Sequence, residues 1–259
     1  MLKLRNLGRV FFGIAIAGIG FVSIYYRDFP YMLIPSNHSG IANPGLLASI
    51  SGALLILAGI CAIFEQQILL TSLLLGTVLL LVFSFYFIPY ELLDTSGYMH
   101  LGEWENAEKE LALASGAFVI AGCFSEKNNR LLIRFLRKLI PLGPFLFSLV
   151  IISFGIDHLL YAKDASDYIP SWISHPLFWI RFTGLALIGS GISIFLKIKV
   201  RLFAALLGTM ILIWFVILHI PKVIASPSMY AAGEITSAFL ALAYSGISFI
   251  IAGRAGKRS

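Results

Sequence analysis

Five ionisable side chains in the second half of the chain lie within or beside long apolar stretches. A charged group in a bilayer is costly, so such groups usually face the interior of a helix bundle and mark a ligand site or a proton pathway. Asp, Glu and His can accept or relay protons, and Arg can pair with a carboxylate or an anionic ligand. All five fall at a similar depth, which predicts one outward-facing polar pocket for a polar or quinone-like head group. The five residues are Asp157, His158, Arg181, His219 and Glu234.

A purely structural role is the alternative for these residues. Under this interpretation the side chains form ion pairs near the membrane interface, and Glu234 and the nearby Lys222 simply extend toward water. The pocket hypothesis makes a different prediction. It expects Arg181→Ala and His219→Ala to impair activity while the folded protein stays in the membrane.

The elements that must position these side chains are membrane-spanning helices. The chain has 259 residues, of which 59% are hydrophobic and 12% are charged, whereas a soluble domain carries roughly 25% charged residues. The mean hydropathy of +0.91 therefore predicts an all-α polytopic protein whose surroundings are the lipid bilayer. Spanning a bilayer takes about 20 apolar residues, and eight runs qualify, the fourth being the weakest. The predicted spans are 7–26, 45–64, 68–90, 109–124, 140–161, 176–196, 202–221 and 234–253.

Lys and Arg are distributed unequally between the two sides of this predicted membrane protein. With these spans, 14 of the 19 basic residues fall on the side that holds both termini. Because cytoplasmic loops are rich in Lys and Arg, we expect both termini to be cytoplasmic, in the inner membrane of a bacterium. The net charge of +6 reflects this topology, so no nucleic-acid partner is predicted.

The two halves of the chain repeat each other, because residues 7–122 match residues 142–253 in a collinear series of motifs. This repeat predicts two tandem four-helix bundles, residues 1–126 and 142–259, joined by a basic linker at 127–141. Four helices return the chain to its starting side, so the two units share one orientation. The matches include Leu7-Gly8 with Leu142-Gly143, Gly20 with Gly155, Tyr26 with Tyr161, Gly52 with Gly184, Leu74-Leu75-Gly76-Thr77 with Leu206-Leu207-Gly208-Thr209, Ile88-Pro89 with Ile220-Pro221, and Ile120-Ala121-Gly122 with Ile251-Ala252-Gly253.

The halves differ where a site would lie. Each of four polar residues of the second half has a neutral counterpart in the first half, which places the candidate site in the second half. These counterparts are Val22 for Asp157, Ser23 for His158, Ser49 for Arg181 and Phe87 for His219.

The Ile-Pro pairs and the basic linker each allow a prediction of local structure. The pairs Ile88-Pro89 and Ile220-Pro221 are expected to end helices at the outer surface, because Pro cannot continue a helical hydrogen-bond ladder. In the linker, one helical face carries Arg130, Arg134, Arg137 and Lys138 at the spacing i, i+4, i+7 and i+8. That spacing predicts either an amphipathic helix lying on anionic lipid or an ordinary basic connection.

Several of these motifs resemble the bacterial DoxX-like membrane family. They are the Gly-rich first helix, the Ile-Pro pairs and the run Lys109-Glu110-Leu111-Ala112-Leu113-Ala114-Ser115-Gly116. The resemblance covers nearly the whole chain as two fused units. It implies a small membrane subunit associated with quinone-linked or thiol-linked oxidoreduction, with a membrane or periplasmic redox partner. Cys61 and Cys123 lie toward the cytoplasmic side, away from the oxidising compartment where thiol enzymes keep their pairs. Quinone is therefore the favoured cofactor, and no metal centre is predicted.

Two other functions stay open, and whether the chain is an enzyme is undecided. A permease for a small solute would work between the two repeats. A non-catalytic scaffold would dock a periplasmic or membrane partner through the acidic outer loops. The first half keeps four acidic groups at the outer side, which are Glu91, Asp94, Glu108 and Glu110.

Overall fold

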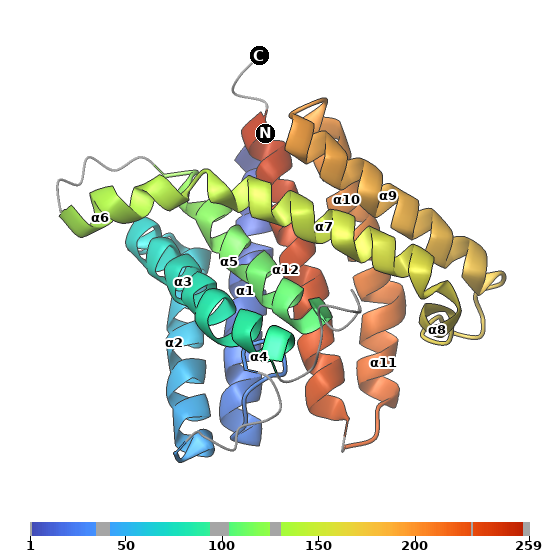
Figure 1. The fold of residues 1–259 in the computed structure, drawn as a ribbon, viewed down its shortest axis with the longest axis horizontal. Coiled ribbons are helices and arrows are strands. Elements are labelled where there is room, and N and C mark those ends of the chain that lie inside the picture. Colours follow the sequence, from blue (N-terminus) through green and yellow to red (C-terminus); the bar gives the residue numbers. More distant parts are fainter. Residues whose placement is uncertain (1, 35–41, 94–103, 125–130, 229, 256–259) are drawn as a thin grey trace.

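The computed structural model describes residues 2–34, 42–93, 104–124, 131–228 and 230–255, and all regular structure in these ranges is helical (Figure 1). Seven helical segments there are long and apolar enough to cross a membrane, so the chain is a multi-pass membrane protein. The elements are α1 Leu2–Tyr26, α2 Pro44–Phe64, α3 Ile68–Val82, η1 Phe83–Phe87, α4 Ile88–Leu93, α5 Glu105–Ala121, α6 Leu131–Leu136, η4 Arg137–Leu139, α7 Leu142–Leu160, α8 Ala162–Ser166, α9 Pro176–Leu196, α10 Val200–Trp214, η5 Phe215–His219, α11 Ile220–Ala225 and α12 Ala231–Ala255.

The fourth predicted span corresponds to α5, which is not one of the seven long apolar segments. This helix has 17 residues, and 13 of them are buried inside the protein. Charged residues occupy its first turns, and Glu110, which the sequence places at the outer mouth, is fully buried at 0% exposure. Its apolar character therefore serves protein packing more than contact with lipid. The count of eight spanning helices stays a prediction.

The two final helices of the repeats, α5 and α12, lie at the centre of the molecule (Figure 1). The first helix of each half packs on the final helix of the other half: α1 packs on α12, and α7 packs on α5. Outside these pairs, α2 packs on α1, α9 on α7, α10 on α12 and α3 on α5. One hydrophobic core runs through both halves. The division into two tandem bundles therefore stays a prediction from the repeat.

Small residues make the close packing of α1 on α12 and of α7 on α5 possible. Gly8 of α1 lies against the backbone carbonyl of Gly246 in α12, and the matching Gly143 of α7 lies against the carbonyl of Ser115 in α5. A Cβ atom at either position would collide with that backbone. Close approach of helix backbones through small residues is the usual basis of packing in membranes.

The prediction that the Ile-Pro pairs end their helices is wrong. In both halves the helix continues for a further segment, α4 and α11, as part of one long apolar span. A π-helical turn precedes each pair, in which the N–H of Ile88 donates to the carbonyl of Phe83 and that of Ile220 to Phe215. The wider turn accommodates a proline ring that would clash with the i−4 carbonyl of a regular α-helix.

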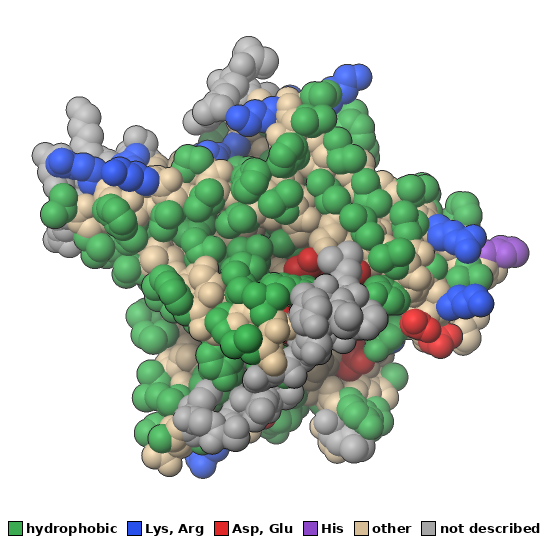
Figure 2. Space-filling view, viewed as in Figure 1, with side chains coloured by type: hydrophobic (Ala, Val, Ile, Leu, Met, Phe, Trp, Pro, Cys, Tyr) green, Lys and Arg blue, Asp and Glu red, His purple; other side chains and the backbone are tan. Residues whose placement is uncertain are grey.

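One end of the molecule gathers the ends of the chain and many basic residues. Gly253 of α12 lies against Arg5 of α1, and the Arg254 Nη1 atom donates to the carbonyl of Val119 in α5 at 3.2 Å. Figure 2 shows Lys and Arg side chains gathered along the upper edge, where both ends of the chain lie in Figure 1. We call this region the basic end.

The linker adopts a more specific arrangement than the sequence predicts. Residues 127–130 lie outside the described residues. After them, α6 buries Ile133 and Leu136 against Leu69 and Phe118 of the first half. Its apolar side is thus partly docked on the protein, while Arg134 on the same helix is exposed.

Candidate ligand-binding cavity

A cavity of about 820 Å³ lies between α5, α7, α9, α10 and α12, with further lining from η5, α11, α8 and the adjacent turn. All four helices of the second half therefore contribute to its wall. The cavity brings together four of the five predicted site residues. They are Asp157, His158, His219 and Glu234.

The ionisable lining comes from helix ends that lie away from the basic end. It combines four carboxylates, two lysines and two histidines, so acidic groups outnumber lysines. In Figure 2, Asp and Glu side chains gather near the middle of the face, below the basic upper edge. The ionisable lining residues are Glu105, Lys109, Asp157, His158, Asp164, His219, Lys222 and Glu234.

The other part of the lining is apolar and lies nearer the middle of the helices. Ile151 of α7, Leu187 of α9 and Met210 of α10 belong to it. Phe154 and Tyr244 also line the cavity, with ring centroids 5.9 Å apart. A polar mouth with an apolar body suits a ligand that has a polar head and an apolar tail.

Asp157 is the least satisfied acidic group of the wall. Both of its carboxylate oxygens are buried and have no hydrogen-bond partner among the described residues. One turn away in α7, the Ser153 hydroxyl donates to Oε1 of Glu108 at 2.5 Å, and Oε2 of Glu108 is likewise buried without a partner. A buried carboxylate without a partner costs free energy. A ligand that donates a hydrogen bond or a proton would recover part of that free energy.

The two histidines present different nitrogens to the cavity wall. His158 Nδ1 lies 2.7 Å from the carbonyl of Phe154, and because a carbonyl can only accept, Nδ1 donates. The neutral ring then keeps Nε2 as a hydrogen-bond acceptor. His219 lies on the π-helical turn η5, and its Nδ1 is buried without a partner among the described residues. Single π-helical turns occur frequently at functional sites.

Both lysines of the cavity are held by neighbouring groups. Lys109 Nζ lies 2.7 Å from Glu105 Oε1 and 5.1 Å from the centre of the Tyr31 ring. Lys222 Nζ lies 3.7 Å above the centre of the Tyr168 ring. Asp157 and the histidines are therefore the groups of the wall that are best placed to meet a ligand.

Arg181, the fifth predicted residue, does not line the cavity, and its side chain is exposed. It makes no hydrogen bond with Asp157. The reason is the helical rotation of α9, which turns Ile180, Thr183 and Leu187 toward the cavity. Residue 181 has the predicted depth along the helix but lies on a different side.

Sequence reasoning missed several lining residues because some of them belong to the other repeat. Tyr31, Glu105 and Lys109 reach the cavity from the first half, which only the packing of α5 makes possible. Tyr244 could have been found, because it is the one tyrosine of the apolar helix α12 and stands where the first half has Leu113.

Comparison of the chain with known proteins gives no match: no family model, curated protein or solved structure is significantly similar to it. The resemblance to the DoxX-like family therefore stays a prediction from the motifs. Among the described residues, no three His, Cys, Asp or Glu side chains are grouped as metal ligands would be.

Proposed function

We propose that the chain is a membrane subunit serving quinone-linked oxidoreduction, with a lipid-soluble ligand bound in the cavity of its second half. In this proposal it is an eight-helix protein of two DoxX-like units in a bacterial inner membrane, with both termini cytoplasmic. The basic end then faces the cytoplasm and the cavity opens toward the outer side. The gathering of basic residues around the helix ends at Arg5 and Arg254 supports this orientation.

The observation that carries the proposal is the amphipathic lining of the cavity. Its volume of about 820 Å³ falls in the range of ligand sites, roughly 300–1,000 Å³. A quinone has a polar ring that needs hydrogen-bond partners and an apolar tail that needs none. The ionisable end and the apolar body of the cavity match these two needs.

The residues of the wall fit such a head group. A bound quinone would supply reversible transfer of two electrons and two protons. His158 Nε2 can accept a hydrogen bond from a ring hydroxyl of the reduced form, the quinol, because Nδ1 is committed to the Phe154 carbonyl. Asp157 can accept a second one, because neither of its oxygens has another partner among the described residues. Both side chains would thereby orient the ring and hold the protons that leave it.

Tryptophan fluorescence offers a direct test. Trp214 lines the cavity, and its ring lies 6.4 Å from that of Trp179. Adding a short-chain quinol, the reduced form whose ring hydroxyls can donate to His158 and Asp157, to the purified protein should quench emission with saturation. Trp214→Phe should remove most of this change. Asp157→Asn and His158→Gln should weaken the apparent affinity at least tenfold, the effect of losing roughly 1.4 kcal/mol.

The exposed Arg181 provides the matched control for this titration. Arg181→Gln should bind the quinol as the unmodified protein does. Quenching that does not saturate, or that is equal in all variants, would show that the quinol only partitions into the micelle. The proposal would then fail.

A permease is the second candidate, because the cavity draws residues from both halves. Lys109 and Glu105 of α5 face a wall made by helices of the other repeat. Carriers often bind substrate at such a repeat interface. Saturable uptake of a small solute into proteoliposomes, lost in Asp157→Asn, would favour this function over quinone binding.

The scaffold alternative loses two of its proposed contact residues. Glu91 and Glu110 were expected at the outer surface, yet Glu91 is 3% exposed and Glu110 is 0% exposed. Asp94 lies outside the described residues. Buried carboxylates cannot contact a docking partner, so this alternative would depend on the other acidic groups of the outer side.

A further inference from the structure

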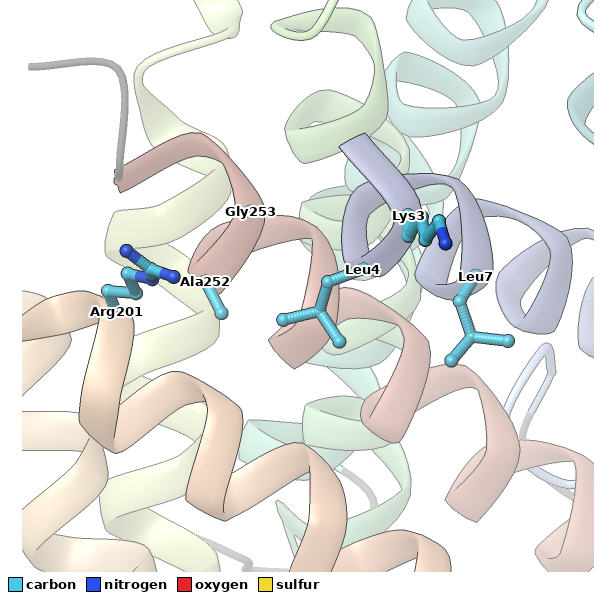
Figure 3. A pocket seen from close by; sticks show the side chains of 6 residues that line it. All are labelled: Lys3, Leu4, Leu7, Arg201, Ala252 and Gly253. Atoms are coloured by element: carbon cyan, nitrogen blue, oxygen red, sulfur yellow. The ribbon is translucent and has the colours of Figure 1, made fainter. Parts of the chain in front are cut away.

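A second hollow, of about 320 Å³, lies at the basic end between α1 and α10. Both helices pack on α12, and the floor of the hollow between them is formed by Ala252 and Gly253. In Figure 3, Leu4 and Leu7 project from α1 into this gap, and Arg201 extends from α10 on its far side. We call it the α1/α10 groove.

The groove combines an apolar floor with two cations. Lys3 and Arg201 line it and are exposed, while Ala252 below them is fully buried. Neither cation has an ion pair with a described carboxylate. Basic pockets between membrane helices of this kind suit the head group of an anionic lipid.

The corresponding surface of the first half, beside α3, α5 and α7, is covered by α6, and we call it the covered groove. Its residues are Lys138, Leu139, Leu142, Leu69, Ala121 and Gly122, in the order of Lys3, Leu4, Leu7, Arg201, Ala252 and Gly253. There, Leu69 is 1% exposed and packs against Ile133 and Leu136 of α6. Apolar side chains of this chain thus cover one groove.

The open groove differs from the covered one at a single decisive position. Arg201 stands where the covered groove has Leu69. A buried leucine selects an apolar cover such as α6, whereas an exposed arginine beside an apolar floor selects a ligand that is both apolar and anionic. Lys3 supplies a second positive charge to the same hollow.

We propose that the α1/α10 groove binds one anionic phospholipid, with its phosphate held by Lys3 and Arg201 and an acyl chain lying along Leu4 and Leu7. The acyl chain takes the position that the apolar side of α6 occupies in the other half. This site is independent of the cavity between α7 and α12 and of the function proposed for it.

Native mass spectrometry of the full chain in a mild detergent tests the proposal. Phosphatidylglycerol and phosphatidylcholine with identical acyl chains are the two probes. Phosphatidylglycerol should bind with one tight site per chain and be preferred roughly 25-fold, which corresponds to about 1 kcal/mol from each of the two cations. Lys3→Gln and Arg201→Gln should each reduce this preference roughly fivefold, and the double variant roughly 25-fold, as expected for about 1 kcal/mol per basic residue near a lipid surface.

Lys138→Gln is the matched control, because Lys138 is the counterpart of Lys3 in the covered groove and is exposed. It should leave the preference unchanged. Equal loss in Lys138→Gln would show that only general positive charge attracts the lipid, and would overturn the proposal. Displacement of the bound lipid by inorganic phosphate at similar affinity would also overturn it, since it would mean that the acyl chain contributes nothing.

Discussion

The two halves of the chain carry matched helices, yet the space that is hollow in the second half is filled in the first. Val22 and Phe87 stand for Asp157 and His219, and they are 3% and 0% exposed. The segment that follows the first helix of each half shows the same contrast between a buried apolar residue and an exposed polar one. Met32 is fully buried in the first half, whereas its counterpart Asp167 is exposed. One helical frame therefore supports either a packed interior or a cavity, depending on a few side chains.

The pair Ser23 and His158 shows how small the decisive change is. The Ser23 hydroxyl donates to the carbonyl of Ile19 at 3.1 Å, one helical turn back. His158 Nδ1 donates to the carbonyl of Phe154, the counterpart of Ile19, at 2.7 Å. Each donor is satisfied by its own helix. Only the histidine retains a second nitrogen that can serve a ligand.

The largest change in stability is expected when the carboxylate of the second half is introduced at the corresponding position of the first half. Val22→Asp puts a carboxylate into packed surroundings and should destabilise the protein by about 3–5 kcal/mol, as an uncompensated buried charge does. The control Val22→Ala removes only apolar contacts and should cost roughly 2 kcal/mol. Unfolding in mixed dodecylmaltoside and SDS micelles measures both. Equal costs would mean that the first half also contains a polar space.

A reciprocal exchange of aromatic rings tests the same difference at the π-helical turns. Phe87→His should cost about 3 kcal/mol, because it replaces a fully buried ring by a polar one. His219→Phe should change stability by less than about 1 kcal/mol, since it removes a buried nitrogen that has no partner among the described residues. Thermal unfolding of the two variants gives the comparison. Similar losses in both would contradict the asymmetry of the halves.

Removing the unpaired carboxylate should be favourable for folding. Asp157→Val introduces the residue of the first half and should stabilise the protein by about 1–2 kcal/mol, because no hydrogen bond within the described residues is lost. The same variant should lose quinol-dependent quenching of Trp214. A destabilised Asp157→Val would show instead that this carboxylate is a structural group.

The smallest change in stability and in ligand affinity is expected from substitution of Arg181. Because its side chain is exposed and does not line the cavity, Arg181→Ala should change stability by less than about 0.5 kcal/mol. Ligand affinity should stay within about twofold, below the roughly 1.4 kcal/mol of a tenfold change. This expectation replaces the impairment predicted from the sequence. A large loss of binding in the titration would restore Arg181 to the site through a contact not formed here.

Much of the architecture could be predicted from the sequence. The apolar runs predicted helices that cross a membrane, because length and hydropathy alone decide whether a segment can enter lipid. Depth along those helices predicted that Asp157, His158, His219 and Glu234 could meet. The repeat predicted which positions correspond, and matched contacts such as Gly8 with Gly246 and Gly143 with Ser115 follow that correspondence.

Only the tertiary structure decided how the helices rotate and which ones meet. Arg181 has the right depth but the wrong side of α9, and a stretch that is apolar all round does not encode which side faces inward. The first helices pack on the final helices of the opposite half, which brings Tyr31 and Lys109 into the cavity. The Ile-Pro pairs do not stop their helices, because a π-helical turn makes room for the ring. The spacing of residues in the sequence determines how deep a side chain lies along its helix. Packing against neighbouring helices determines the direction in which that side chain points.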